Sequence, residues 1–188
     1  MKRWWWLPAL ALLASCARLP ERPGGRWVAP EWPAWSLAGR VALRAGERGG
    51  TANLYWRQVG AAYLIRLNGP FGQGGVEISG DPAGVVLRQA GGGEYRAGDP
   101  ETLLLRATGW RLPLSGLRYW IFGRPEPGMA AELHRDEAGR PSRLDQAGWT
   151  IRFEKYRSFG GAELPARIRL ERTGVRLKLV IDRWQQTS

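Results

Sequence analysis

Residues that carry metal, redox or nucleophilic chemistry are scarce in this sequence. Its 188 residues include one cysteine, Cys16, and one histidine, His134. One cysteine cannot form an internal disulfide, and His134 has no second histidine, cysteine or carboxylate at the spacing of metal ligands. No Gly-rich loop followed by Lys-Ser/Thr is present to hold phosphates. We therefore expect no metal, no cofactor and no enzymatic activity.

The acidic residues do not predict an acid/base site either. They are scattered along the chain, where we expect them to be solvated partners of arginine. The adjacent pair Asp136 and Glu137 is expected to face opposite sides of a strand, which would keep the two carboxylates apart.

Lysine is also scarce, and arginine supplies almost all of the positive charge. Only Lys2, Lys155 and Lys178 are lysines among the 28 basic residues, which outnumber 17 acidic residues to give a formal net charge of +11. A basic surface can favour nucleic acid, anionic lipid or an acidic partner protein, and net charge alone does not choose among them. A genome rich in Arg, Gly and Ala codons would produce the same composition without functional meaning.

The chain has no apolar run of about 20 residues, the length that a transmembrane helix needs. Residues 1–15 instead have the features of a secretory signal peptide, with Lys2 and Arg3 followed by an apolar stretch and then small residues. Loss of Lys2 and Arg3 with the signal would leave 26 basic against 17 acidic residues, a net charge of +9. Export argues against nucleic acid as the partner.

The end of this segment, Leu13-Ala14-Ser15-Cys16, resembles the bacterial lipobox. The resemblance implies that the thiol of Cys16 is diacylglycerylated, that the signal is cut before it, and that the new amino group is acylated. Stable membrane anchoring takes two or more lipid signals, so three chains would hold the protein permanently. An Asp directly after the lipidated cysteine would resemble an inner-membrane retention signal, but this position is Ala17. We therefore expect the protein to be anchored in the outer membrane, with its domain facing the periplasm.

Residues 16–34 are expected to form a tether, with docking of Trp27 and Trp32 on the domain left open. Four prolines and two adjacent glycines within this range oppose both helix formation and ladder pairing. At about 3 Å per residue, an extended segment of this length could span about 50 Å. We therefore divide the chain into a signal peptide (1–15), a lipidated tether (16–34) and one folded domain (35–188).

From residue 35 onward, apolar and polar residues mostly alternate with the period of two that is typical of strands with one solvated face. Asp99 followed by Pro100 predicts a helix start, and Gly123 and Pro125 predict a helix end. We expect strands near 35–44, 52–57, 63–68, 76–79, 85–87, 130–135, 142–145, 149–154, 167–171 and 175–182, and helices at 100–107 and 114–122. A sheet of ten or eleven strands must curl or close. The fold class is therefore mainly β, a partly open barrel with helices across its mouth.

Six segments in order resemble the LolB family. They are Trp35-Ser-Leu-Ala-Gly-Arg-Val-Ala-Leu, Leu54-Tyr-Trp-Arg-Gln, Tyr63-Leu-Ile-Arg-Leu-Asn-Gly-Pro-Phe-Gly, Leu112-Pro-Leu-Ser-Gly-Leu-Arg-Tyr-Trp-Ile-Phe-Gly-Arg-Pro, Gly148-Trp and Leu177-Lys-Leu-Val-Ile-Asp-Arg-Trp. Each segment alone is a weak signal, but together they cover nearly the whole expected domain. The resemblance implies a single antiparallel half-barrel of about eleven strands, with a short helical lid over an apolar cavity.

The same resemblance implies a function, that of an outer-membrane receptor for lipoproteins. Such a receptor accepts triacylated lipoprotein cargo from a LolA-like periplasmic carrier and inserts it into the inner leaflet of the outer membrane; we expect it to act as a monomer. The acyl-chain cavity is expected to be lined by Leu37, Val41, Leu54, Trp56, Ile65, Leu67, Val76 and Ile78 from the strands, and by Leu104, Leu117, Trp120 and Ile121 from the lid.

The segment Asn68-Gly69-Pro70-Phe71-Gly72 resembles a loop of the family, of the type Asn-Pro-Leu-Gly, whose apolar residue touches membrane. Here Gly69 is inserted and Phe replaces Leu, so the correspondence holds to about one position. We predict that Pro70, Phe71 and Gly72 form a membrane-insertion loop with Phe71 at its tip. The alternative is that Phe71 folds back onto the core. A second departure is the Pro-rich segment before Trp35, where the family tends to have a helix.

A rival interpretation keeps the fold but not the cavity. Alternation reports only which side chains face inward, so each cavity candidate could equally belong to a solid core. The chain would then be a lipid-anchored structural or assembly subunit of an envelope complex.

Overall fold

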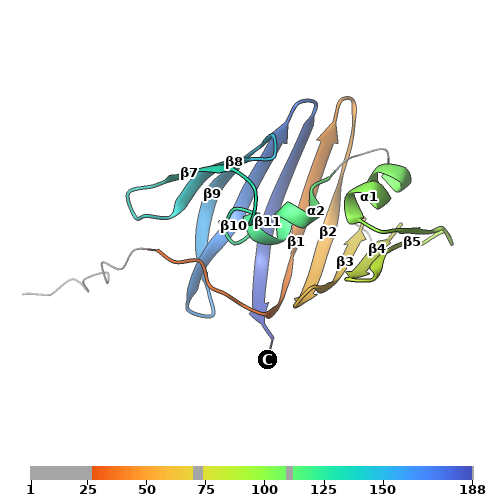
Figure 1. Ribbon diagram of the computed structural model, residues 1–188, viewed down its shortest axis with the longest axis horizontal. Helices are drawn as coiled ribbons and strands as arrows, with labels where there is room; N and C mark the ends of the chain where they lie inside the picture. Colours follow the sequence, from red (N-terminus) through yellow and green to blue (C-terminus); the bar gives the residue numbers. More distant parts are fainter. Residues whose placement is uncertain (1–26, 70–73, 109–111, 188) are drawn as a thin grey trace, which may run out of the picture.

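The computed structural model describes residues 27–69, 74–108 and 112–187, which form one curled antiparallel sheet with two helices on its concave side (Figure 1). The helices are α1 (Pro100–Thr108) and α2 (Leu114–Trp120). The strands are β1 (Ala34–Ala45), β2 (Arg48–Val59), β3 (Ala62–Asn68), β4 (Val76–Asp81), β5 (Gly84–Gln89), β6 (Glu94–Ala97), β7 (Ala131–Arg135), β8 (Pro141–Gln146), β9 (Trp149–Phe159), β10 (Ala162–Arg172) and β11 (Val175–Gln186). The predicted fold class is confirmed.

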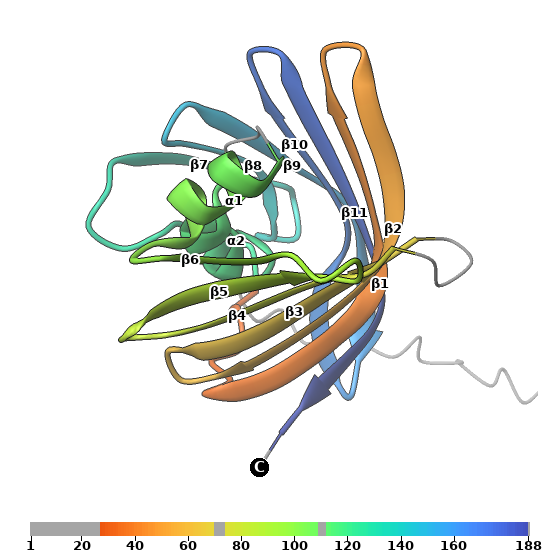
Figure 2. The same cartoon turned by 90° about the vertical axis from the view of Figure 1, so that its right-hand side faces the viewer.

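The strand order is β6-β5-β4-β3-β2-β1-β11-β10-β9-β8-β7. Two meanders of hairpins are thus joined at the centre by the pairing of the first strand with the last, and both helices lie in the connection between the two meanders. Seen from the side, the sheet wraps around the helices without closing (Figure 2). The sequence reading missed β6, a short strand whose side chains are mostly exposed and which therefore has no apolar alternation.

Local irregularities in the ladders help the sheet to bend. The register of β1 against β11 shifts between Ala38 and Gly39, and β10 shifts against β9 around Pro165. Bulges of this kind bend a strand and increase its twist. At Gly39 the backbone of β11 approaches so closely that a Cβ atom would lie 2.1 Å from the carbonyl oxygen of Val180. A side chain at this position would therefore push the two central strands apart.

Aromatic rings fill one end of the concave side. Trp35, Phe122 and Trp184 form a triangle whose ring centroids are 4.6 to 5.3 Å apart, and Trp56 lies 5.3 Å from Trp35. All four are almost completely buried. Because Phe122 follows α2 and its C-cap residue Ile121, this cluster fixes the end of the helix against β1 and β11.

A buried glutamine holds the other side of α2. Gln146 on β8 accepts a hydrogen bond from Trp120 Nε1 (2.7 Å) and one from the backbone N–H of Glu126 (2.8 Å), and its amide donates to the carbonyl oxygen of Glu126 (2.8 Å). Gln146 is 3% exposed and Trp120 is fully buried. Buried polar groups need such partners, so this residue joins α2 and the segment after it to the sheet.

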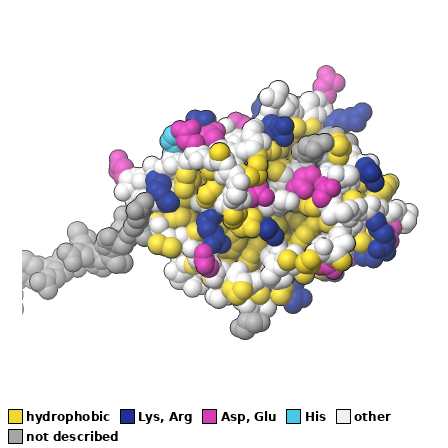
Figure 3. Space-filling model, viewed as in Figure 1, with side chains coloured by type: hydrophobic (Ala, Val, Ile, Leu, Met, Phe, Trp, Pro, Cys, Tyr) yellow, Lys and Arg dark blue, Asp and Glu magenta, His cyan; other side chains and the backbone are white. Residues whose placement is uncertain are grey.

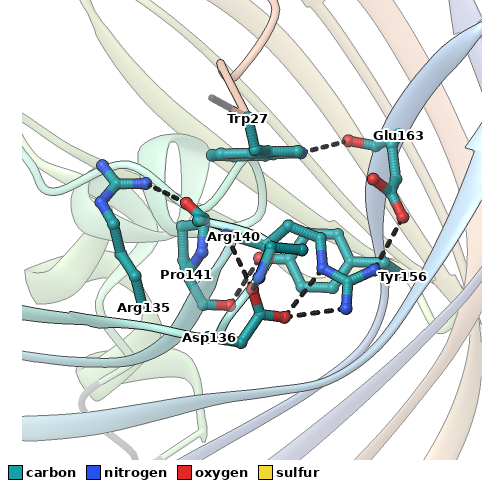
Figure 4. A network of polar contacts seen from close by, with 9 residues as sticks. Trp27, Arg135, Asp136, Arg140, Pro141, Tyr156 and Glu163 are labelled. Atoms are coloured by element: carbon teal, nitrogen blue, oxygen red, sulfur yellow. Dashed lines mark hydrogen bonds and ion pairs between the residues drawn. The ribbon is translucent and has the colours of Figure 1, made fainter. Parts of the chain in front are cut away.

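The described part of the predicted tether, from residue 27, lies against the domain. Trp27 donates from Nε1 to the carbonyl oxygen of Glu163 (2.9 Å), and its ring packs edge-on against Tyr156, with centroids 5.8 Å apart. Figure 4 shows this contact above the Arg140 side chain, which bridges the carboxylates of Asp136 and Glu163 at 2.8 Å each. Any free tether would therefore end before Trp27.

One sequence expectation near β7 needs correction, and one contact there was not predicted. His134 Nε2 lies 3.1 Å from Oε1 of Glu132, two residues away on the same face of the strand, and among the described residues no group of three metal-ligating side chains is formed. Asp136 lies after the end of β7 rather than on the strand. Burial alone would raise the pKa of Asp136, but hydrogen bonds from the side chain and backbone of Arg140 lower it. Asp136 therefore stabilises a turn.

Candidate functional site

An apolar cavity lies between the concave face of the sheet and the two helices. It has a volume of about 70 Å³, and all of its lining side chains are apolar. Five strands (β1 to β4 and β11), both helices and the segments flanking α2 contribute to it. The lining residues are Leu37, Val41, Leu54, Trp56, Ile65, Leu67, Ile78, Leu104, Leu112, Leu114, Leu117, Ile121, Leu177, Leu179 and Ile181. On the helix-covered face, apolar side chains are visible among the charged ones (Figure 3).

Register explains why residues far apart in sequence meet in this cavity. Leu37 on β1 pairs with Trp56 on β2, and Trp56 in turn pairs with Ile65 on β3. Inward-facing side chains of adjacent strands stand next to one another across the sheet. On the other side of β1, Val41 pairs with Leu179 of β11. The cavity wall is therefore continuous across the central strands.

Ten of the twelve predicted cavity residues line this space; Val76 and Trp120 do not. Val76 is half-buried and packs against the core near the start of β4. Trp120 faces β8, where its indole is bonded to Gln146, so it belongs to the solid part of the interior. The apolar side chains of this helical stripe thus divide into two groups: Leu117 and Ile121 face the cavity, and Trp120 packs in the solid interior.

The sequence reading missed five lining residues. Leu112 and Leu114 flank the start of α2, and the other three are Leu177, Leu179 and Ile181 of β11. The apolar alternation of the last strand is visible in the sequence, but the place of that strand in the sheet is not. Only the pairing of β11 with β1 brings these side chains beside the first strands.

The two helices are linked by one carboxylate. Glu101 of α1 accepts hydrogen bonds from the backbone N–H of Ser115 (2.9 Å) and from its hydroxyl (3.3 Å). The residue preceding α2 is Pro113, which provides no side-chain cap. Because the first N–H groups of a helix lack partners within the helix, Glu101 replaces the missing cap and ties the helices to each other.

Basic residues line up on the face of the sheet opposite the cavity. Cross-strand pairing places four of them side by side in consecutive strands, Lys178 on β11, Arg169 on β10, Arg152 on β9 and Arg143 on β8. Like charges in directly opposed positions destabilise a sheet. Arg169 and Arg143 have carboxylate partners at 2.8 and 2.6 Å, whereas no ion pair is found for Lys178 or Arg152 within the described residues. This row could therefore contact anionic groups outside the domain.

Two kinds of feature are absent from the described residues. No group of three or more His, Cys, Asp or Glu side chains is placed to hold a metal ion in the described ranges. Within these ranges there is also no helix of sufficient length and hydropathy to cross a bilayer. Cys16, Pro70, Phe71 and Gly72 lie outside the described residues, so their predicted roles remain predictions.

Solved structures with a similar fold include members of the LolA superfamily. A LolA superfamily protein from Nitrosomonas europaea has a TM-score of 0.54 and 11% sequence identity, with 86% of this chain and 89% of that chain covered. A DUF1329 family protein from Desulfovibrio piger has a TM-score of 0.56 and 8% identity, with 84% and 87% covered. At such low identity these similarities support the fold alone.

Sequence comparison is more specific. The family described as "Outer membrane lipoprotein LolB" matches residues 33–184. An "Outer-membrane lipoprotein LolB" from Halorhodospira halophila is 43% identical over 155 residues, covering 82% of this chain and 76% of the relative. A protein of the same name from Pseudomonas paraeruginosa is 38% identical over 189 residues, covering 94% and 92%. These relatives confirm the outer-membrane location that the lipobox predicted, and the chain belongs to the LolB family of outer-membrane lipoproteins.

Proposed function

We propose that this protein accepts lipoproteins from a LolA-like carrier in the periplasm and inserts them into the inner leaflet of the outer membrane. The observation that carries the proposal is the wholly apolar cavity beneath two helices on an open sheet. Family membership supports the same role. We propose that the protein acts as a monomer and makes or breaks no covalent bond.

The energetics require such a cavity. Removing each CH₂ of an acyl chain from water is worth about 0.8 kcal/mol, so a lipoprotein with three acyl chains must be shielded from water during transfer. The sequence has no nucleotide-binding motif to drive the steps. Each transfer must therefore run downhill: this domain binds the chains more tightly than the carrier does, and the membrane binds them more tightly still.

The cavity must enlarge to hold a chain. Engineered cavities of about 150 Å³ bind one benzene molecule, and the space here is about 70 Å³. We propose that α1 and α2 move outward when a chain enters, and that Glu101 keeps them together through its hydrogen bonds to Ser115. This movement separates the receptor from the structural subunit, because a solid core is packed to crystal-like density and would not open for a chain.

The anchor and tether complete the proposal. Lipids on Cys16 would hold the chain in the membrane, and the ten residues between Cys16 and Trp27 could extend for about 30 Å. Docking of Trp27 on the domain therefore shortens the predicted reach from about 50 Å. The row of basic side chains on the outer face would be attracted to anionic headgroups within this distance.

A reconstituted transfer assay tests the function directly. The carrier loaded with a labelled triacylated lipoprotein is mixed with this protein, and vesicles are then added. We expect the label to move first from the carrier to this protein and then from this protein to the vesicles. Label that stays on the carrier in the presence of this protein would favour the structural-subunit alternative.

In the same assay, Phe71→Glu is expected to leave acceptance from the carrier unchanged and to slow delivery to vesicles by about tenfold or more. A carboxylate in place of the apolar tip would have to lose hydration on entering the membrane, at a cost of several kcal/mol. Gln73→Glu is the matched control, because it adds the same charge two residues away and keeps the aromatic side chain. Equal delivery rates for Phe71→Glu and Gln73→Glu would contradict the insertion-loop role.

A further inference from the structure

A second pocket, here called the side pocket, adjoins the apolar cavity and has a different character. Its volume is about 290 Å³, and it shares Trp56, Ile65 and Leu114 with the lining of the cavity. Unlike the cavity, it is also lined by polar side chains, among them Tyr63 and Arg118. A ligand could therefore place an apolar part in the cavity and a polar part in the side pocket.

Two hydrogen-bond donors at this pocket are buried without a partner in the described structure. They are the hydroxyl of Tyr63 and the Nε–H of Arg118. Leaving a buried donor unpaired costs about 1–3 kcal/mol, and native proteins contain few such groups. Arg118 uses another nitrogen, Nη2, to donate to Tyr119 Oη at 2.7 Å, and its guanidinium lies over the Tyr119 ring. The guanidinium is thus held in place, while its Nε–H has no hydrogen-bond partner among the described residues.

The backbone around Tyr63 also holds it in place. Tyr63 on β3 pairs with Gly80 on β4. A Cβ atom at residue 80 would lie 2.4 Å from Cζ of the tyrosine ring, so the ring occupies the space that a side chain there would need. Burial, with the nearby Glu101 carboxylate, raises the pKa of Tyr63 to about 12. The hydroxyl is therefore protonated, and able to donate, at physiological pH.

The charged side chains that line the pocket are Arg118 and Asp81, and Glu101 lies nearby, so two carboxylates outweigh one guanidinium and favour a neutral acceptor. Both oxygens of Glu101 accept hydrogen bonds from Ser115, so this carboxylate does not need a partner from a ligand. The same carboxylate would repel a phosphate or a free carboxylate approaching Tyr63. An ester carbonyl oxygen accepts hydrogen bonds, carries no net charge, and is found where acyl chains join glycerol.

From this geometry we propose that the side pocket binds the ester-linked glyceryl group of a diacylglyceryl ligand, whose acyl chains extend into the apolar cavity. The Tyr63 hydroxyl and the Arg118 Nε–H donate hydrogen bonds to the ester carbonyl oxygens. The inference rests on the proposed acyl-chain function and deepens it. The same diacylglyceryl chemistry can come from the modified cysteine of a lipoprotein or from a membrane phospholipid.

Three ligands separate the possibilities when titrated into the full-length chain with Cys16→Ala, which has no lipid of its own. They are a triacylated cysteine lipopeptide, a phosphatidylglycerol, and hexadecane, which has a chain but no ester. Tyr63→Phe is expected to weaken lipopeptide binding by about 2-fold to 10-fold, and Arg118→Lys by about 10-fold or more, since hydrogen bonds to charged groups are stronger. Hexadecane binding should be unchanged in both variants. Tyr55→Phe, which removes a hydroxyl from the outer face of β2, should change neither.

The outcomes are distinguishable. Lipopeptide binding that is unchanged in Tyr63→Phe and Arg118→Lys would overturn the side-pocket inference. A loss of hexadecane binding equal to the loss of lipopeptide binding would also overturn it, because the variants would then disturb only packing. A selective loss with either diacylglyceryl ligand supports the ester site, and the comparison of lipopeptide with phosphatidylglycerol identifies its source. Failure of the unsubstituted chain to bind hexadecane would instead contradict the acyl-chain function itself.

Discussion

Val41→Glu is expected to lower the affinity of the protein for an acyl ligand by more than tenfold. Val41 lines the cavity from β1, opposite Leu179 of β11. A carboxylate there would have to lose its hydration when an apolar chain fills the space, and burial of an unpaired charge costs several kcal/mol. Val41 is only half-buried, so in the absence of ligand the new carboxylate can remain hydrated and the fold can tolerate it. Titration with a fluorescent fatty acid measures the effect.

The matched control is Ala42→Glu on the same strand. Ala42 is the next residue along β1, so its side chain points to the outer face, where its cross-strand neighbour is Lys178. The control adds the same charge but keeps the cavity lining intact, and its affinity should equal that of the native protein. Equal affinities in Val41→Glu and Ala42→Glu would show that the chain does not enter this cavity.

Gln146→Leu is expected to lower the free energy of unfolding by about 3 kcal/mol or more. The substitution removes the partners of Trp120 Nε1 and of the backbone N–H and carbonyl groups of Glu126. Each buried polar group left unpaired costs about 1–3 kcal/mol. Because the glutamine is 3% exposed, water cannot readily replace it.

Urea unfolding of the native and substituted domains measures this difference. Gln186→Leu is the control, since Gln186 is exposed at the end of β11 and makes no side-chain hydrogen bond within the described residues. It should change stability by less than about 0.5 kcal/mol. If Gln146→Leu changes the free energy of unfolding by no more than the control does, the glutamine does not hold α2 in the way described.

The strands and helices were largely predictable because their signals are local. Alternation located ten of the eleven strands, and the Asp99-Pro100 and Gly123-Pro125 signals located both helices. The sequence reading failed at β6, whose polar residues carry no alternation. It also extended the second helix to Phe122, whereas α2 ends at Trp120 and Ile121 is its C-cap. Helix ends are commonly uncertain by one or two residues.

The cavity was predictable only in part, because alternation reports the inward face and not what that face surrounds. Leu37 and Trp120 have the same apolar signature, yet one lines the cavity and the other is bonded to Gln146 in the solid interior. Distinguishing them requires the positions of α2 and β8, which depend on contacts between residues far apart in sequence. Docking of Trp27 was left open by the sequence for the same reason, and the structure shows it through contacts with Tyr156 and Glu163.

The central claim is that an acyl chain enters the space between α1–α2 and the central strands. A fatty acid with a nitroxide at the end of its chain, titrated into the methyl-labelled protein, tests this directly by NMR. We expect saturable broadening that is strongest for the methyl signals of cavity residues Leu54, Leu117 and Leu179, and weaker for those of Leu64 and Val86, which lie on the outer face of β3 and β5. Broadening of the outer-face methyls alone, or no saturable broadening of the cavity methyls, would contradict the account.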